Sequence, residues 1–143
     1  MTEKSCGTIP YTIIGGVIQY LLIRSKITGL CSFPKGHTEN DESETDTALR
    51  ETLEETSLRV DIDAKIRFEI SYTISNGNTK TVVYFPARFS NQSPRRNGCF
   101  EDYEYMLLPY SDAYARLSYG NLRQILSATN DILTDQNKKI SLD

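Results

Sequence analysis

The apolar positions of the chain follow the period of a strand in most places. They alternate with polar ones from 65 to 75 and run almost without interruption from 17 to 25. Alternation is typical of a half-buried strand, whereas an unbroken apolar run indicates a strand covered on both faces. Gly15-Gly16 and Asn76-Gly77 provide turns, the second a strong hairpin signal. The remaining predicted strands span 6–14, 58–64, 80–89 and 104–108.

Pro86 falls inside the strand predicted at 80–89, where it predicts a sheet edge, a bulge or the end of the strand.

The first predicted helix lies in the acidic stretch that ends at Leu58. Asp46 and Thr47 offer N-cap chemistry there. Its expected apolar stripe consists of Ala48, Leu49 and Leu53.

Two more helices are expected near the C-terminus. Ser111 or Asp112 can cap a helix that runs through Leu117, and a longer amphipathic helix follows at 119–134. We expect the tail 135–143 to be frayed. The apolar side of the longer helix is formed by Leu122, Ile125, Leu126 and Ile132.

This order of elements predicts an α/β fold of the α+β kind, in which a mixed sheet is sandwiched between helices. With 143 residues, we expect a single domain over 1–143. The net charge of −3 argues against bulk electrostatic binding of nucleic acid.

Cys6, Cys31 and Cys99 are spaced too widely for a metal-ligand pattern, so we expect buried, reduced thiols. No apolar run approaches the roughly 20 residues of a membrane span. We therefore expect a cytoplasmic protein.

Charge is concentrated in the stretch from Phe33 to Leu58. Glu51, Glu54 and Glu55 lie on one side of its predicted helix, where like charges repel. A solvated acidic face is one interpretation. A divalent cation between the carboxylates is the other, because Mg²⁺ prefers carboxylates together with substrate phosphates.

The spacing of these residues favours the cation. Glu42 follows Gly36 after five residues, Arg50-Glu51 follows after seven more, and Glu54-Glu55 comes next. This resembles the Nudix box, G-x5-E-x7-R-E-U-x-E-E-x-G-U, in which U is aliphatic. The box spans 36–58, and every charged position matches.

Two positions depart from the box. Thr52 replaces an aliphatic residue, which weakens the expected packing beneath the helix. Ser57 replaces the last glycine, at a place where glycine relieves left-handed strain. We expect Ser57 to cost about 1 kcal/mol.

Segments outside the box resemble the asymmetrical diadenosine tetraphosphate hydrolases of the Nudix superfamily. They are CG…IPY, QYLLIRS, FPKGH, KTVVYF and FEDYEYMLLPYSDA. The resemblance covers roughly residues 5–134. It implies the Nudix fold, Mg²⁺ with Mn²⁺ as a substitute, and hydrolysis of diadenosine tetraphosphate to ATP and AMP by in-line attack of water on phosphorus.

The resemblance also implies metal-binding and catalytic residues. Glu54 and Glu55 match the principal metal ligands, and Glu51 matches a residue that is a ligand or the general base. The backbone carbonyl of Lys35, in a turn at Gly36, is a further expected ligand. Arg50 belongs to the catalytic set through a bracing pair with Glu42.

A further carboxylate is expected just before the strand at 104–108. Glu101 aligns best with a family residue that acts as ligand or base. Glu104 competes for that role, and an exposed loop carboxylate is the third interpretation.

For the substrate, the resemblance places Lys35, His37 and Lys80 near phosphate, and Tyr84 and Tyr119 against the base. Ordinary core packing is the alternative for both tyrosines. Arg95 and Arg96 are expected to be solvated. The predicted partner is a small-molecule nucleotide, bound by a protein that we expect to be a monomer.

Other functions remain open at this stage. A Nudix pyrophosphatase could act on a nucleoside triphosphate, a nucleotide sugar, an inositol pyrophosphate or a capped RNA 5′ end. A non-catalytic nucleotide-binding domain is disfavoured, because the box carboxylates are present.

Overall fold

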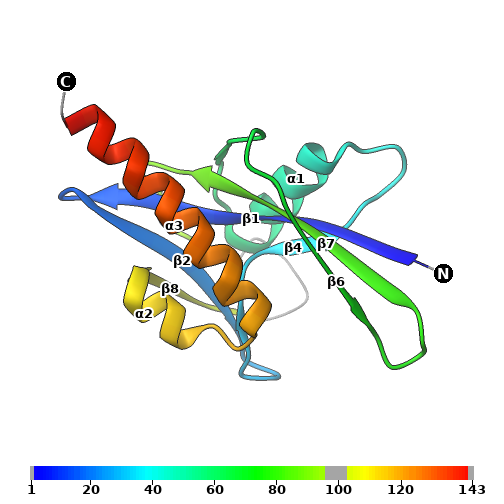
Figure 1. The fold of residues 1–143 in the computed structure, drawn as a ribbon. Coiled ribbons are helices and arrows are strands. Elements are labelled where there is room, and N and C mark those ends of the chain that lie inside the picture. The colour runs from blue at the N-terminus through cyan, green and yellow to red at the C-terminus, as the bar shows by residue number, and fades with distance from the viewer. Residues whose placement is uncertain (1, 96–102, 142–143) are drawn as a thin grey trace.

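A mixed β-sheet lies at the centre of the molecule (Figure 1). The structure is a computed structural model that describes residues 2–95 and 103–141. Its long strands are β1 (Thr2–Ile14), β2 (Val17–Ser25) and β7 (Thr79–Arg88). β1 pairs antiparallel with β2 and parallel with β7. The predicted turn joins β1 to β2, and both of its glycines have positive φ, 57° and 80°.

Shorter strands extend the sheet in the order β3-β2-β1-β7-β5, with β4, β6 and β8 paired to β1, β7 and β2. β6 (Phe68–Thr73) and β7 form the hairpin predicted from Asn76-Gly77, and Gly77 has φ 85°. The other strands are β3 (Cys31–Ser32), β4 (Lys35–His37), β5 (Asp61–Ile62) and β8 (Tyr103–Pro109).

Helices cover both faces of this sheet. They are α1 (Glu44–Thr56), α2 (Tyr110–Arg116) and α3 (Gly120–Ser141). Val82 and Tyr84 of β7 pack in one core cluster with α2 and α3, whereas Val83 and Phe85 pack with Ala48 of α1. In Figure 1, α3 crosses in front of the strands and α1 lies behind them. The predicted mixed sheet between helices is confirmed.

The predicted helix caps are wrong. α1 begins earlier than expected, because the Ser43 side chain accepts a hydrogen bond from the Asp46 N–H at 3.1 Å. α2 has Pro109 at its N-cap position and no side-chain cap, so neither Ser111 nor Asp112 caps it.

The expected fraying of the C-terminal tail is also wrong for residues 135–141. α3 continues to Ser141, since no glycine or proline interrupts the stretch. Thr129 and Leu133 are buried on its inner side, and Ile132, predicted there, is only half-buried. None of the helices in the described residues is long and apolar enough to span a membrane.

Pro86 lies at neither an edge nor an end of β7. It falls where the antiparallel neighbour of β7 changes from β6, which pairs up to Tyr84, to β5, which pairs from Ala87. A residue without an N–H is accommodated at such a gap. Cys6 and Cys31 are buried and free, as predicted, and Cys99 lies outside the described residues.

Candidate active site

Helix α1 turns a face of small residues toward the sheet. Its buried residues are Thr47, Ala48, Thr52 and Thr56, whereas Leu49 is 39% exposed. Of the predicted stripe, Ala48 is confirmed as buried, Leu53 is half-buried, and Leu49 is wrong. Small residues fit here because α1 lies close to β1, where Thr8 and Thr52 join their hydroxyls at 2.7 Å. The hydrogen bond to Thr8 explains how the box tolerates a threonine at position 52.

This orientation brings Glu51 against strand β4. A Cβ atom on Gly36 would overlap the Glu51 carboxylate in its present position, so any other residue there would require the Glu51 side chain to move. The predicted turn at 34–37 is wrong, because Lys35–His37 form β4 and pair with Ser5–Gly7 of β1. Gly36 serves close approach of the carboxylate rather than a turn.

Arg50 joins the acidic loop, β4 and α1. Its guanidinium donates to both Glu42 oxygens at 2.8 and 3.0 Å, to Glu51 at 2.7 Å and to the His37 carbonyl at 2.9 Å. The predicted Glu42–Arg50 pair is thus present. These hydrogen bonds lower the pKa of Glu42 to about 2 and raise the pKa of Arg50.

Glu51 and Glu55 lie on the sheet side of α1, whereas Glu54 is exposed. Burial raises the pKa of Glu51, although the hydrogen bond from Arg50 opposes that shift. The Oε2 atom of Glu55 is buried, and the Tyr105 hydroxyl donates to the Glu55 backbone carbonyl. β8 therefore holds the C-terminal part of α1 in place.

The carboxylates of α1 fit a hard divalent cation by their chemistry, because carboxylate oxygen is the ligand that Mg²⁺ and Mn²⁺ prefer. Within the described residues, no group of three or more His, Cys, Asp or Glu side chains is close enough to hold a metal. Arg50 Nη1 instead contacts Glu51 at 2.7 Å and Glu54 at 3.3 Å. A guanidinium there shows that this position favours positive charge.

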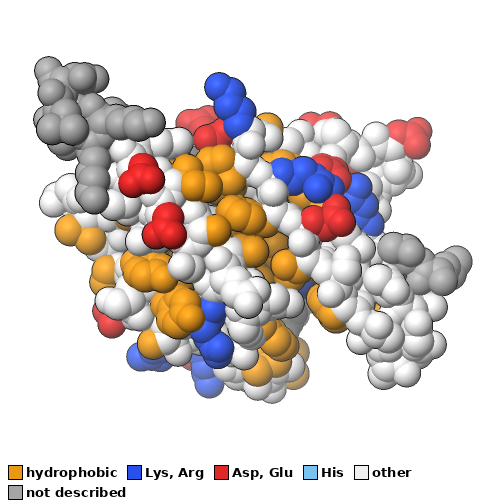
Figure 2. Space-filling view, viewed as in Figure 1, with side chains coloured by type: hydrophobic (Ala, Val, Ile, Leu, Met, Phe, Trp, Pro, Cys, Tyr) orange, Lys and Arg blue, Asp and Glu red, His pale blue; other side chains and the backbone are white. Residues whose placement is uncertain are grey.

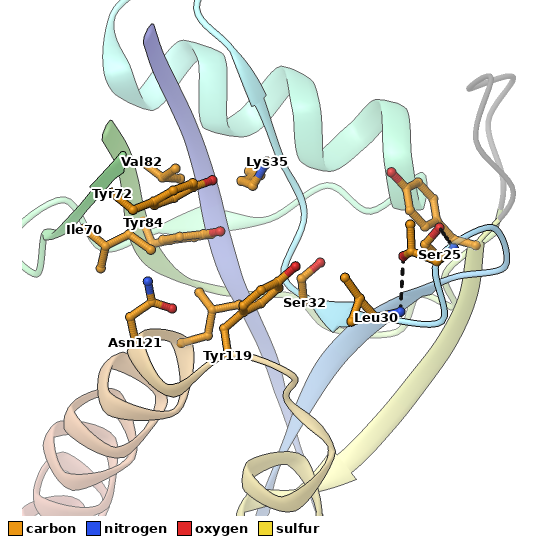
Figure 3. Close-up of a pocket in the computed structure, with 13 residues that line it drawn as sticks. Ser25, Leu30, Ser32, Lys35, Ile70, Tyr72, Val82, Tyr84, Tyr119 and Asn121 are labelled. Carbon is orange, nitrogen blue, oxygen red and sulfur yellow. Dashed lines mark hydrogen bonds between the residues drawn. The ribbon is translucent and has the colours of Figure 1, made fainter. Parts of the chain in front are cut away.

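A cavity of about 530 Å³ opens beside Lys35 of β4 (Figure 3). Lys35, Tyr84 and Tyr119 line it, and the contacts with phosphate and base that the resemblance implied for them stay predictions. Burial and the neighbouring Lys80 lower the pKa of Lys35, while Glu55 and Glu51 oppose that shift. Two adjacent ammonium groups near carboxylates form a natural contact for polyphosphate.

Further residues of the cavity wall had not been predicted as site residues from the sequence: Ser25, Thr28, Leu30, Ser32, Ile70, Tyr72, Val82, Tyr103, Asn121 and Leu122.

The tyrosines differ in what they can offer a ligand. Tyr84 is 1% exposed and packs edge-on against Phe33, with ring centroids 6.1 Å apart. Tyr72 and Tyr119 are 40% and 47% exposed. Stacking at Tyr84 stays a prediction, and Tyr72 is the better-placed ring of β6 and β7. The sequence feature that could have identified Tyr72 is the hairpin, because it pairs Tyr72 with Lys80.

Other predicted residues lie apart from the cavity. The His37 side chain is exposed, and only its carbonyl contacts Arg50. Glu104 pairs with Arg24 at 3.3 Å on the surface, and Arg95 is exposed. Glu101 and Arg96 lie outside the described residues, so the role predicted for Glu101 stays a prediction.

Basic side chains form no broad surface on the face that carries α3. Figure 2 shows Lys and Arg there in small groups, interspersed with Asp, Glu and apolar side chains, among the described residues. A nucleic acid is therefore not the partner that this face favours.

Comparison with known proteins adds family relationships. Residues 13–126 match the NUDIX domain model. The chain is 26% identical to the asymmetrical bis(5′-nucleosyl)-tetraphosphatase of Sus scrofa, over 93% of this chain and 97% of that protein.

Solved structures share the fold. An Ap4A hydrolase binary complex from C. elegans superposes with a TM-score of 0.85 at 23% identity, covering 93% of this chain and 98% of that one. The NUDIX domain of Shewanella oneidensis NrtR, complexed with ADP ribose, gives 0.74 at 17% identity, with coverages of 93% and 89%.

Proposed function

The chain belongs to the NUDIX domain family, and from that premise we propose that it is a metal-dependent hydrolase of dinucleoside polyphosphates. The proposed reaction converts diadenosine tetraphosphate and water into ATP and AMP. The chain is similar to an asymmetrical bis(5′-nucleosyl)-tetraphosphatase over 93% of its length, and this similarity supports the substrate class.

One structural observation carries the proposal. The Lys35 side chain lines the aromatic cavity. It is also near enough to Glu55 and Glu51 for their negative charges to act on its pKa, which they raise against the larger effect of burial. A nucleoside in the cavity would therefore place its phosphates between the lysines and the acidic face of α1. Few small molecules other than nucleotides combine an aromatic ring with charge of this kind.

Different residues bind the phosphates, the base and the metal in this proposal. Lys35 and Lys80 bind phosphate oxygens, and Tyr72 and Tyr119 contact the base. Glu51, Glu54 and Glu55, with Glu101 and the Lys35 carbonyl as further predicted ligands, would hold the metal. Bound Mg²⁺, or Mn²⁺ as a substitute, supplies positive charge that stabilises the attacking and leaving oxygens.

The chemical step transfers a phosphoryl group to water. The water oxygen forms a bond to phosphorus in line with the bridging oxygen, that P–O bond breaks, and one nucleotide leaves. The water proton passes to a carboxylate, for which Glu51 and Glu101 are the two candidates.

Product analysis tests the proposal. Diadenosine tetraphosphate, ATP, ADP ribose and a capped RNA should be compared as substrates with Mg²⁺ present. ADP ribose belongs in the panel because a structural neighbour binds it. Preferred release of ATP and AMP from diadenosine tetraphosphate is expected. Turnover of another compound with no ATP released would overturn the proposed substrate. Monomeric state and cytoplasmic location stay predictions from the sequence.

A further inference from the structure

The wall of the cavity is formed by two separate groups of side chains. The first group surrounds Tyr84 and Tyr119, where β6, β7 and the start of α3 meet. The second group comes from the loop between β2 and β3 and from the first residue of β8. It consists of Thr28, Leu30 and Tyr103, and we call it the distal end of the cavity.

The two groups lie far apart along the sheet. Three strands, β7, β1 and β2, separate β6 from β8 in the order of pairing. With adjacent strands about 4.8 Å apart, the four steps from β6 to β8 amount to roughly 19 Å along the sheet. Figure 3 shows Lys35 and Ser32 between the Tyr84 side of the cavity and Leu30. A single nucleoside is shorter than this span, so one that stacks on Tyr119 does not reach the distal end.

Hydrogen bonds fix the loop that carries the distal end. The Ser25 hydroxyl accepts from the Ile27 and Thr28 N–H groups, both at 3.2 Å. The Gly29 N–H donates to the Ser25 carbonyl at 2.7 Å. The Leu30 N–H donates to the Thr28 hydroxyl at 3.2 Å. Because these bonds hold the backbone of the loop in place, binding a ligand there requires little further ordering.

The side chains of the distal end are accessible to a ligand. Leu30 is 41% exposed, and it belongs to none of the hydrophobic core clusters of the described residues. Thr28 is exposed and Tyr103 is half-buried. An aliphatic and an aromatic side chain on the same wall offer the kind of surface against which a base packs.

We propose that the distal end binds the second nucleoside of a dinucleoside polyphosphate. This inference rests on the proposed function, which places the first base against Tyr72 and Tyr119 and the phosphates at Lys35. Such a substrate has a base at each end and phosphates between them. The cavity has the same order, with Lys35 and Ser32 between its two ends. Contacts at both ends favour a substrate with two bases over a nucleoside triphosphate, which has one.

Two non-hydrolysable nucleotides that differ by one nucleoside test the proposal. One is diadenosine tetraphosphate with methylene groups in place of its bridging oxygens. The other is the matching adenosine tetraphosphate, with a methyl ester on its terminal phosphate so that both compounds carry the same charge. Calorimetry with Mg²⁺ present should show that the native protein binds the dinucleotide about 5- to 150-fold more tightly, the range for one stacked base.

Variants of the distal end should lose this preference for the dinucleotide. We expect Leu30→Ala and Tyr103→Ala each to lower the ratio of the two affinities about 5-fold or more, chiefly by weakening the dinucleotide. Ile27→Ala is the matched control. Ile27 belongs to the same loop and is 77% exposed, but it does not line the cavity, so its variant should keep the native preference.

Equal affinity of the native protein for the two analogues would overturn the second-nucleoside site, even if diadenosine tetraphosphate is hydrolysed. So would a preference that survives in both Leu30→Ala and Tyr103→Ala, or one that Ile27→Ala lowers just as much. A preference for the dinucleotide without hydrolysis of diadenosine tetraphosphate would support the site and refute the proposed reaction. Binding of neither analogue would refute both.

Discussion

At the scale of single residues, Ser57 has an unfavourable backbone conformation that the fold tolerates. It ends α1 in the left-handed region, with φ 63° and ψ 11°, and its N–H bonds the Leu53 carbonyl at 2.8 Å. The sequence comparison with the box had placed a glycine there. The bond closes the helix end without help from the serine side chain.

Ser57→Gly should therefore stabilise the protein by about 1 kcal/mol, measured as the free energy of unfolding in urea. Gly77→Ser is the reverse control. Gly77 also has positive φ, 85°, with open space around it, so serine there should cost a similar amount. A destabilised Ser57→Gly protein would contradict the strain assigned to position 57.

Glu54 tests the acidic face of α1. Its side chain is half exposed, and its hydrogen bonds to described residues are with Arg50, so Glu54→Gln should leave stability almost unchanged. We expect kcat to fall at least about 100-fold, because a neutral amide is a poor ligand for a hard cation. Nucleotide affinity should change little.

Glu69→Gln is the control for Glu54→Gln, since Glu69 is an exposed carboxylate that pairs with Arg67 at 2.8 Å. Its kcat should match that of the native protein. Undiminished turnover in Glu54→Gln would refute the metal role proposed for Glu54.

Sequence spacing located the residues of the site that contact one another through one helix and its adjoining loop. Gly36, Glu42, Arg50 and Glu51 do meet in the structure. Spacing did not locate Asn121 or Tyr72. They come from separate elements, and only the packing of α3 and β6 around the cavity brings them together.

At the scale of elements, α1 is attached to β1 by a buried hydroxyl pair. Thr52→Val alone should lower the free energy of unfolding by about 1–3 kcal/mol, because it leaves the Thr8 hydroxyl buried without its partner. Thr8→Val alone should act likewise. The double variant should recover most of the loss, since both polar groups are then gone.

Urea unfolding of the four proteins gives this coupling directly. Losses that simply add in the double variant would contradict the pairing. Recovery would show that the box position occupied by Thr52 accepts an aliphatic residue once Thr8 is changed as well.

The N-terminal end of α1 is held by an ion-pair network. Glu44 pairs with Arg67 at 2.8 Å and with Lys4 of β1 at 2.6 Å, and these hydrogen bonds lower its pKa to about 2 from 4.5. A lowered pKa stabilises the fold above pH 4.5 and loses that contribution as the pH falls toward 2.

Glu44→Gln should therefore flatten the decline of Tm between pH 4.5 and pH 2. Added salt should weaken the same contribution in the native protein, because the network is partly exposed. Glu104→Gln, at a surface pair, provides the control. If the Tm of Glu44→Gln fell with pH as steeply as that of the native protein, this network would not contribute to acid destabilisation.

Elements were predicted well where apolar periodicity was strong. β2 spans the expected 17–25, and the β6–β7 hairpin follows its Asn-Gly turn. Periodicity failed for α1, because its inward face consists of Ala48 and of threonines, which patterning does not count as apolar. Its start depended on one hydrogen bond that the Asp46 N–H donates to the Ser43 side chain, which no periodicity reveals.

At the scale of the whole molecule, the order of elements predicted a mixed sheet between helices. It did not predict the parallel pairing of β1 with β7, which joins Thr2–Tyr11 to Thr79–Arg88. That pairing places Lys80 close to β4 and Lys35. The junction of charged face and cavity is thus a property of the sheet topology rather than of any motif.

We propose that the protein cleaves a dinucleoside polyphosphate asymmetrically at this junction. The most direct measurement is chromatographic separation of the products formed from diadenosine tetraphosphate with Mg²⁺, with and without a chelator. We expect ATP and AMP in equal amounts, and no reaction once the metal is removed. Two molecules of ADP, or no cleavage with Mg²⁺ or Mn²⁺ present, would contradict it.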